Sequence, residues 1–331
     1  MSGAAGRRAD GVSTAVIGQA RGQEQRASLS LDRLSLDREA RPGVSMGRLL
    51  LRELRQNRLA AASVVFLIAV VALALLAPYI APYSPQKQEL MNRLTPPTRE
   101  HWMGTDDVGR DTYSRLLYGA RVSLFIAVTG TLGAVVLGTL LGLIAGFCGG
   151  WVDEGIMRVI DVTFAFPGVL FAILIVSVLG PGLSNLVIAL IFFGAPTLSR
   201  IVRGNVLSLK RQEFVEAARA MGATSSRILV QHILINCVAP IIVYATLGIA
   251  ISILIASGLG FLGLGAQPPQ AEWGAMLSDA RKTLLLSPYM SIFPGLAIFF
   301  TVLSLNIIGD SVRDALDPFT PRRAAARQMK G

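Results

Sequence analysis

Residues 162–199 read VTFAFPGVLFAILIVSVLGPGLSNLVIALIFFGAPTLS and contain no Asp, Glu, Lys or Arg. A helix of this length would extend about 57 Å, roughly twice the ~30 Å hydrocarbon core of a bilayer. The Gly-Pro-Gly sequence at 180–182 interrupts the stretch near its middle, and these residue types mark turns. The stretch therefore predicts two membrane-spanning helices joined by a short loop, with a kink at Pro167 in the first of them.

Four other apolar runs are each long enough to cross a bilayer once. They lie at 59–80, 122–147, 233–271 and 289–308, and glycines interrupt the third near its end. The composition agrees, because 52% of the 331 residues are hydrophobic and 16% are charged, against about 25% charged in soluble domains. The sequence thus predicts an all-α membrane protein with six transmembrane helices.

The formal net charge of +10 is distributed around the apolar runs. Basic residues precede the first run at 48–58, follow Ser199 at 200–211 and end the chain at 322–330. Cytoplasmic loops of membrane proteins are enriched in Lys and Arg, so both termini are expected in the cytoplasm. This flanking distribution does not indicate nucleic-acid binding. Residues 1–47 have no sustained apolar face, so a disordered cytoplasmic tail is expected there.

The sequence contains no motif for catalysis or metal binding. It has no Walker A loop for ATP, and its two histidines and two cysteines are not clustered as metal ligands. Ion-coupled carriers place ionisable residues near the membrane midplane, where the predicted spans have none. Arg158 and Asp161 lie near the inner end of the third span, and we expect them to pair with each other. If the chain moves a solute uphill, the energy must therefore enter from outside the spans.

The segment after the fourth span, residues 213–222, reads EFVEAARAMG. Apolar residues at i, i+4 and i+7 predict one stripe on a short helix. The residues of this stripe are Phe214, Ala218 and Met221. Gly222 suits the left-handed conformation that ends helices, and Thr224 or Ser225 can cap a second helix. Two interpretations remain open, a helix that docks on a partner and an amphipathic helix that lies on lipid headgroups.

Three stretches of the sequence together resemble the C-type permease subunit of bacterial dipeptide and oligopeptide ABC importers. Glu216-Ala217-Ala218 with Gly222 resembles the EAA loop of binding-protein-dependent permeases. The stretch HWMGTDDVGRD at 101–111, with YGAR at 118–121, is similar to one motif of the C-type subunit. The stretch GFLGLGAQPPQAEWG at 260–274 is similar to another. The resemblance covers about residues 48–318.

The resemblance implies a type I ABC importer permease fold with a cytoplasmic coupling helix. Its expected parts are the tail 1–47, a first helix with an extracytoplasmic segment at 48–118, a transmembrane domain at 119–310 with the EAA loop at about 204–240, and a cytoplasmic tail at 311–331. The implied location is the bacterial plasma membrane. The implied partners are a second, homologous permease, two ATPase subunits or domains, an extracytoplasmic binding protein, a peptide substrate and membrane lipid. ATP and Mg would be held by the ATPase partners, so this chain is expected to be a transport subunit, not an enzyme, without a cofactor of its own.

The family's EAA helix docks on the ATPase, which implies a coupling role for one set of residues here. These are Glu216, Ala217, Ala218, Met221 and Gly222. The matched motifs concern coupling and folding, so another cargo on the same scaffold, such as nickel chelates or glutathione, stays open. An ion-coupled carrier is the third alternative.

Two outer segments, at 82–121 and 266–288, are expected on the extracytoplasmic side. The glycine run after the fifth span is expected to form a re-entrant turn with Trp273. The candidates for contact with the binding protein or for loop structure are Asp106, Asp107, Arg110, Asp111 and Trp273. The charged residues among them either bind that protein or pair with one another to fold the loop, and we favour the internal pairing. Polar side chains expected to line the path are Ser177, Asn185, Thr301, Ser304 and Asn306.

Overall fold

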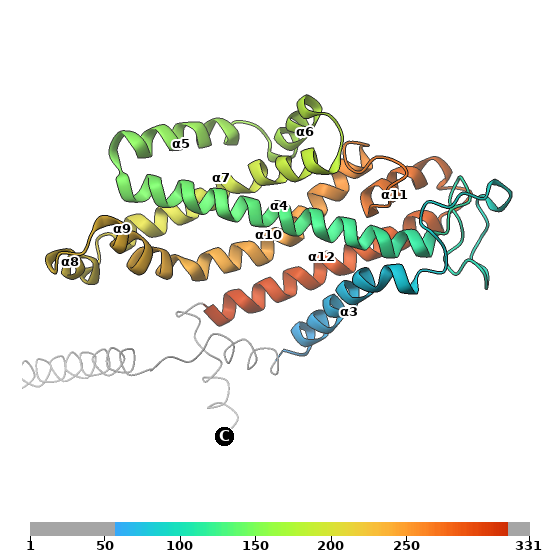
Figure 1. Cartoon of the computed structure of the whole chain (residues 1–331), viewed down its shortest axis with the longest axis horizontal. Helices are drawn as coiled ribbons and strands as arrows, with labels where there is room; N and C mark the ends of the chain where they lie inside the picture. The colour runs from blue at the N-terminus through green and yellow to red at the C-terminus, as the bar shows by residue number, and fades with distance from the viewer. Residues whose placement is uncertain (1–56, 317–331) are drawn as a thin grey trace, which may run out of the picture. The chain divides into compact units, whose positions relative to one another are not determined.

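The computed structural model describes residues 57–316, and the expectations for residues 1–47 and for the last residues of the chain lie outside this range. Within this range the regular secondary structure is helical, apart from one isolated antiparallel bridge between Thr105 and Asp111. The long helices are α3 (Arg58–Ile80), α4 (Thr112–Cys148), α7 (Leu183–Leu209), α10 (Ile235–Phe261) and α12 (Tyr289–Leu316) (Figure 1). The short ones are η1 (Leu90–Asn92), α5 (Gly150–Phe164), α6 (Gly168–Leu179), α8 (Glu213–Ala220), α9 (Ser225–Arg227), η2 (Ile228–Leu234), α11 (Trp273–Ala280) and η3 (Arg281–Thr283).

Among the described residues, five helices are long and apolar enough to cross a membrane, with Ser225–Phe261 counted as one of them. A sixth span results if α5 and α6 are taken together, although their axes are bent by 93°. The predicted kink at Pro167 is therefore a turn of about a right angle. Proline has no N–H to donate and disfavours the helical conformation of the residue before it, which explains the break at this point. The six-span, all-helical prediction is confirmed.

Two helices extend beyond their apolar runs. α4 begins at Thr112, ten residues before the predicted start of the second span, because Asp111 caps it. The Asp111 carboxylate accepts hydrogen bonds from the Ser114 backbone N–H (2.8 Å) and hydroxyl (2.7 Å). α12 continues to Leu316, eight residues beyond the predicted end at 308. Both expected domain boundaries, at 118/119 and at 310/311, therefore fall inside helices.

α4 packs closely against α7 along a row of glycines. Gly138, Gly142 and Gly146 recur every four residues on the face of α4 that meets α7. A Cβ atom at Gly142 would lie 2.6 Å from the Ser199 carbonyl oxygen. Small residues at this spacing let membrane helices approach closely. The signal is readable in the sequence as GTLLGLIAG at 138–146, but it was not among the features that predicted the spans.

Gly142→Ala is expected to lower the free energy of unfolding by about 1–3 kcal/mol, because the added methyl group meets a backbone oxygen that cannot turn away. Thermal unfolding of the purified protein in detergent measures this change. The matched control is Gly204→Ala on α7, where an added Cβ meets no described atom within 4 Å. That control should be neutral or slightly stabilising. Equal unfolding temperatures for the two variants would contradict close packing of α4 on α7.

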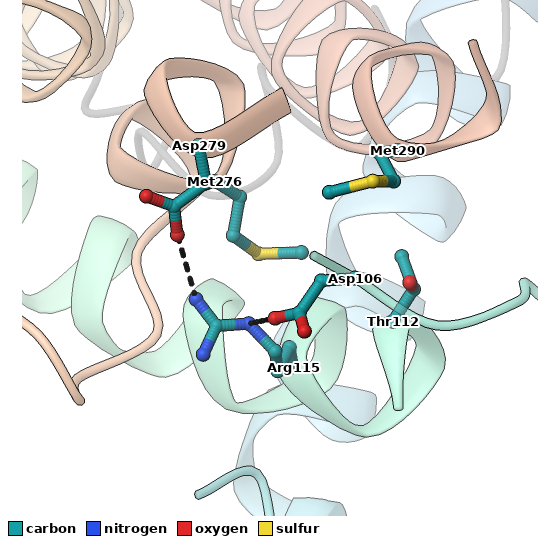
Figure 2. A pocket seen from close by; sticks show the side chains of 6 residues that line it. All are labelled: Asp106, Thr112, Arg115, Met276, Asp279 and Met290. Atoms are coloured by element: carbon teal, nitrogen blue, oxygen red, sulfur yellow. Dashed lines mark hydrogen bonds and ion pairs between the residues drawn. The ribbon is translucent and has the colours of Figure 1, made fainter. Parts of the chain in front are cut away.

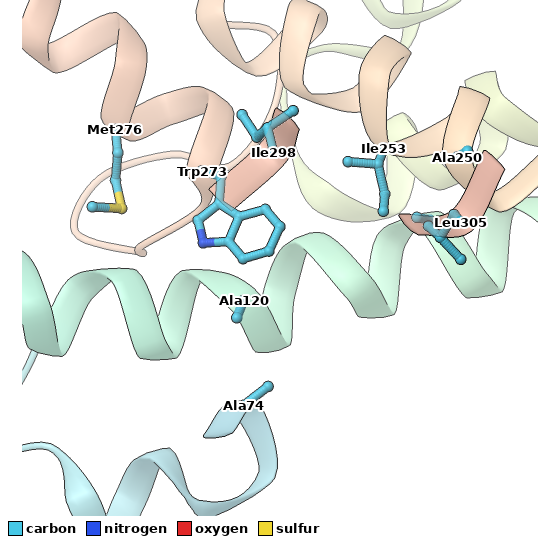
Figure 3. Packing of buried hydrophobic residues seen from close by; sticks show 9 residues of the cluster. Ala74, Ala120, Ala250, Ile253, Trp273, Met276, Ile298 and Leu305 are labelled. Atoms are coloured by element: carbon cyan, nitrogen blue, oxygen red, sulfur yellow. The ribbon is translucent and has the colours of Figure 1, made fainter. Parts of the chain in front are cut away.

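Trp273, the first residue of α11, lies in a core where several helices meet (Figure 3). It is 2% exposed and packs with residues of α4, α10 and α12. These neighbours include Ala120, Ile253 and Ile298. Its indole Nε1 donates to the Leu116 carbonyl oxygen at 3.1 Å. The second outer segment thus turns back into the helical bundle and joins three long helices.

Two ion pairs attach α5 to α7. Arg203 holds Asp153 through Nε (2.5 Å) and Nη2 (2.6 Å), and Arg200 Nη2 lies 2.5 Å from Asp161 Oδ1. The expected pairing of Arg158 with Asp161 is therefore wrong. Arg158 instead lies 3.4 Å from Glu154, one turn away on α5. The geometry explains the difference, since an arginine of α7 reaches Asp161, which sequence spacing on α5 alone does not reveal.

Candidate coupling surface and outer charge cluster

α8 is a short helix with one buried and one exposed side. Val215 and Ala218 are 0% and 2% exposed and pack in a cluster with residues of α4, α7, η2 and α10. Phe214 and Met221 are 42% and 82% exposed. Of the predicted stripe Phe214, Ala218 and Met221, only Ala218 is buried, and Val215, which the stripe left out, is buried with it. Phe214 and Met221 remain accessible to another surface.

The C-terminus of α8 ends at Gly222 in a Schellman motif. Gly222 has φ +82°, the left-handed conformation expected from the sequence. The Ala223 N–H donates to the Ala218 carbonyl (3.0 Å), and the Gly222 N–H donates to the Arg219 carbonyl (3.0 Å). These two bonds satisfy carbonyl groups that a helix end leaves free. The direction in which α8 projects is therefore set by this turn.

The chain then continues as one helix from Ser225 to Phe261. Thr224 caps its start by accepting a hydrogen bond from the Arg227 N–H (3.4 Å), as predicted. Ile228–Leu234 is π-helical, and Pro240 lies inside α10 without ending it. A displacement of α8 would therefore pass into α10 through an unbroken helix.

The coupling residues predicted from the sequence lie together on and just after α8. Glu216, Ala217, Met221 and Gly222 are exposed, whereas Ala218 is buried. Glu213 and Glu216 lie in the first turn and Arg219 in the last, the distribution that favours a helix dipole. The exposed side thus offers a small alanine, a methionine and an acidic end to a partner.

The charged residues of the first outer segment are engaged mainly with one another. Arg110 Nε lies 2.5 Å from Asp106 Oδ2, and the Arg110 N–H donates to Asp106 Oδ1 at 2.8 Å. Asp111 caps α4 and lies 2.9 Å from His101 Nδ1. The Asp107 side chain is 31% exposed and lies 4.0 Å from Arg110 Nη2. These contacts fold the loop and leave Asp107 as its most accessible carboxylate among these three aspartates.

Trp273 is buried, so of its two expected roles it serves the structure of the segment and is not a surface contact. Its large apolar ring is instead part of the core, and its one polar atom is satisfied there. The buried Glu272 beside it was not predicted to have a role, although it stands within the matched 260–274 stretch. Glu272 is the N-cap of α11 and accepts hydrogen bonds from the Gly274 and Ala275 N–H groups.

The five polar residues predicted to line a path do not come together. Ser177 is exposed on α6, and Asn185 on α7 donates to the Leu179 (2.9 Å) and Gly180 (3.0 Å) carbonyls at the end of α6. The other three are on α12, where Thr301 and Ser304 are buried and Asn306 donates to the Val302 carbonyl (3.0 Å). Bonds to the neighbouring backbone are the usual use of such side chains in membrane helices.

A second charged pair in the outer region was not found from the sequence. Arg115, 2% exposed, lies between Asp106 and Asp279 (Figure 2). Its Nε is 3.5 Å from Asp106 Oδ2, and its Nη2 is 3.4 Å from Asp279 Oδ2. Burial raises the pKa of the Asp279 carboxyl, although the two nearby arginines act to lower it. Arg115 and Asp279 are 164 residues apart, so no local spacing could link them.

Comparisons with known proteins agree in class. Residues 138–321 match the family model described as binding-protein-dependent transport system inner membrane component. Residues 45–97 match the N-terminal TM domain of oligopeptide transport permease C. The dipeptide transport system permease protein DppC of Alkalihalophilus pseudofirmus is 47% identical over 83% of this chain and 90% of its own length.

Two further similarities were found. The glutathione transport system permease protein GsiD of Pectobacterium atrosepticum is 47% identical over 81% of this chain and 89% of its own length. A solved structure of the MetNI methionine ABC transporter in an inward-facing conformation shares 16% sequence identity with a TM-score of 0.49. It covers 61% of this chain and 96% of that one.

Proposed function

The chain belongs to the family of binding-protein-dependent transport system inner membrane components and is an ABC importer permease of the dipeptide and oligopeptide type, and from this premise we propose that it forms half of a translocation path for short peptides. The other half would come from a second, homologous permease. Peptide would arrive from an extracytoplasmic binding protein, and ATP would be hydrolysed on two partner ATPase subunits or domains. This chain itself is a transport subunit of a multi-pass inner-membrane type.

The observation that carries the coupling role is the attachment of α8. Its buried residues Val215 and Ala218 fix it to the bundle, while Phe214 and Met221 stay exposed, Phe214 beside the His232 ring. The unbroken helix from Ser225 to Phe261 connects it to a membrane span. Of the two interpretations of this segment, docking on an ATPase uses both features, because a rigid attachment is what transmits force. The basic residues that flank the spans support the same orientation, with α8 and both termini in the cytoplasm and the outer segments on the opposite side.

Glutathione is a second candidate cargo. The glutathione permease relative and the dipeptide permease relative are both 47% identical to this chain, so overall identity does not separate the two cargoes. The match to the N-terminal domain of oligopeptide permease C favours peptides. Both cargoes carry amide groups and free carboxylates, and competition between a labelled dipeptide and glutathione for uptake distinguishes them.

Uptake of a labelled di- to pentapeptide by the complete importer in proteoliposomes is expected to require ATP in the compartment that faces α8. It should persist when ionophores collapse the proton and sodium gradients, since the apolar runs of the spans contain no Asp, Glu, Lys or Arg to bind a coupling ion. A non-hydrolysable ATP analogue is the control and should give no uptake. Uptake that continues without ATP and stops with the ion gradient would refute the proposal.

A further inference from the structure

A polar cavity of about 140 Å³ lies beside the outer arginines. Its lining includes Gly260 at the end of α10, Gly263 after it, and the charged side chains of Arg110, Arg115 and Asp279. The remaining polar side chains on its wall are Gln267, Gln270 and Ser278. Because one water occupies about 30 Å³ of liquid, the cavity has room for a small organic group with a few waters.

Arg115 lacks the close contacts that a buried guanidinium usually makes. Ionised pairs of this kind have N···O distances of about 2.7–2.9 Å, whereas Arg115 reaches its two carboxylates at 3.5 and 3.4 Å. Its Nη1 is buried and has no hydrogen-bond partner among residues 57–316. A buried donor without a partner is costly, so the site is incomplete in this conformation.

Asp279 occupies the space between the two arginines only loosely. Its Oδ2 lies 3.4 Å from Arg110 Nη2 and 3.4 Å from Arg115 Nη2, and its side chain is 32% exposed. Asp106 is held much more firmly, because it is 4% exposed and accepts bonds from Arg110 Nε and from two backbone N–H groups. Of the two carboxylates, Asp279 is therefore the one that can be displaced towards solvent.

We propose that Arg110 and Arg115 form a carboxylate-binding site in which Asp279 stands in for the ligand. A carboxylate that enters the cavity would take the arginine Nη donors, and Asp279 would turn outwards. The carboxylate has two candidate sources, the C-terminus of a cargo peptide and an acidic side chain of a docked binding protein. Both sources rest on the proposed function. The chemistry of the site does not depend on that choice.

Asp279→Asn tests the stand-in role. Removing the internal competitor is expected to strengthen binding of acetate about tenfold, the effect of one charge-assisted hydrogen bond. The measurement is the unfolding temperature of the full chain, in its assembled complex, across a titration of sodium acetate against sodium chloride at constant ionic strength. The matched control is Asp107→Asn, which removes a charge 4.0 Å from Arg110 Nη2 but does not line the cavity, so it tests the loss of charge without vacating the site.

The proposal is supported if acetate stabilises the Asp279→Asn variant more than the unmodified protein and the Asp107→Asn control. Equal stabilisation of all three would overturn it. If Asp279→Asn does not fold, hydrogen exchange of residues 263–280 in the unmodified protein decides the matter. Slower exchange in acetate than in chloride supports the site, and identical exchange overturns it.

The same assay identifies the source of the carboxylate. A dipeptide with a free C-terminus should stabilise Asp279→Asn, and its C-terminal amide should not, if the ligand is the cargo. If both peptides are inert while the binding protein stabilises the variant more than it stabilises Asp107→Asn, the ligand is an acidic side chain of that protein. Because acetate binding is measured without transport, the site stands or fails independently of the proposed function.

Discussion

Gly222→Val is expected to reduce peptide uptake to background while the importer still assembles and hydrolyses ATP. Gly222 has φ +82°, and a residue with a Cβ atom is strained there by roughly 1–2 kcal/mol. No described atom lies within 4 Å of the position that a Cβ would take, so the effect comes from the backbone and not from a steric clash. The strain is relieved if the Schellman turn opens, which changes the direction of α8 relative to the helix that follows. Uptake and ATP hydrolysis are measured side by side in proteoliposomes.

Two variants control for this effect. Asparagine tolerates the left-handed conformation better than other residues with a side chain, so Gly222→Asn should retain much of the uptake. Gly204→Val places the same side chain in the interior of α7, at a position where an added Cβ meets no described atom and φ is not positive. That variant should assemble and transport. Normal uptake by Gly222→Val would show that the turn does not set the position of the coupling helix.

The sequence predicted the number and type of the spans because apolar length is a local property. Residues 59–80 and the Gly-Pro-Gly break at 180–182 needed no partner to be interpreted, and α3 and the gap between α6 and α7 lie at these positions. Gly222 was predictable for the same reason, since a glycine after a short periodic segment indicates a left-handed C-terminus. Features set by neighbours in sequence were therefore recovered.

Features set by distant contacts were not recovered. The polar first turns of α4 gave no apolar signal, although Asp111 starts the helix there. Asp161 pairs with Arg200 of α7 instead of Arg158, which is nearer in sequence. Trp273 is buried by helices that come from three other parts of the chain. The buried side of α8 is set by α7 and α10, so a stripe chosen by spacing alone selected residues 214 and 221, which are exposed.

Glu272 is a buried acidic residue that joins the second outer segment to α4. It is 0% exposed, and its carboxylate accepts hydrogen bonds from the Ser123 hydroxyl (3.0 Å) and from the Gly274 and Ala275 N–H groups (2.8 Å each). Gly260 of α10 leaves the space that this carboxylate fills, since a Cβ there would lie 2.5 Å from Glu272 Oε2. One side chain thus caps α11 and fixes it against two long helices.

Glu272→Ala is expected to lower the free energy of unfolding by about 3–5 kcal/mol, because it removes a helix cap and leaves two buried donors and one half-buried donor without an acceptor. That is a large part of the roughly 5–15 kcal/mol that stabilises a typical domain. The expected result is a low yield of assembled complex and a much lower unfolding temperature. The control is Glu100→Ala, an exposed glutamate of the first outer segment, which should change neither quantity.

The dependence of stability on pH separates the charge of Glu272 from its hydrogen bonds. Burial raises the pKa of the Glu272 carboxyl above its ordinary value of 4.5, although its three donors act to lower it. The folded protein therefore binds this proton more tightly than the unfolded chain. The stability that this group contributes is full below about pH 4.5 and is lost as the pH rises through the raised pKa of the folded state.

Glu272→Gln keeps one acceptor oxygen and cannot titrate, so its unfolding temperature should fall less than that of the unmodified protein as the pH rises. Because Asp279 titrates with the same sign in both proteins, the difference between the two curves reports on Glu272. Parallel curves would show that Glu272 acts through its hydrogen bonds alone.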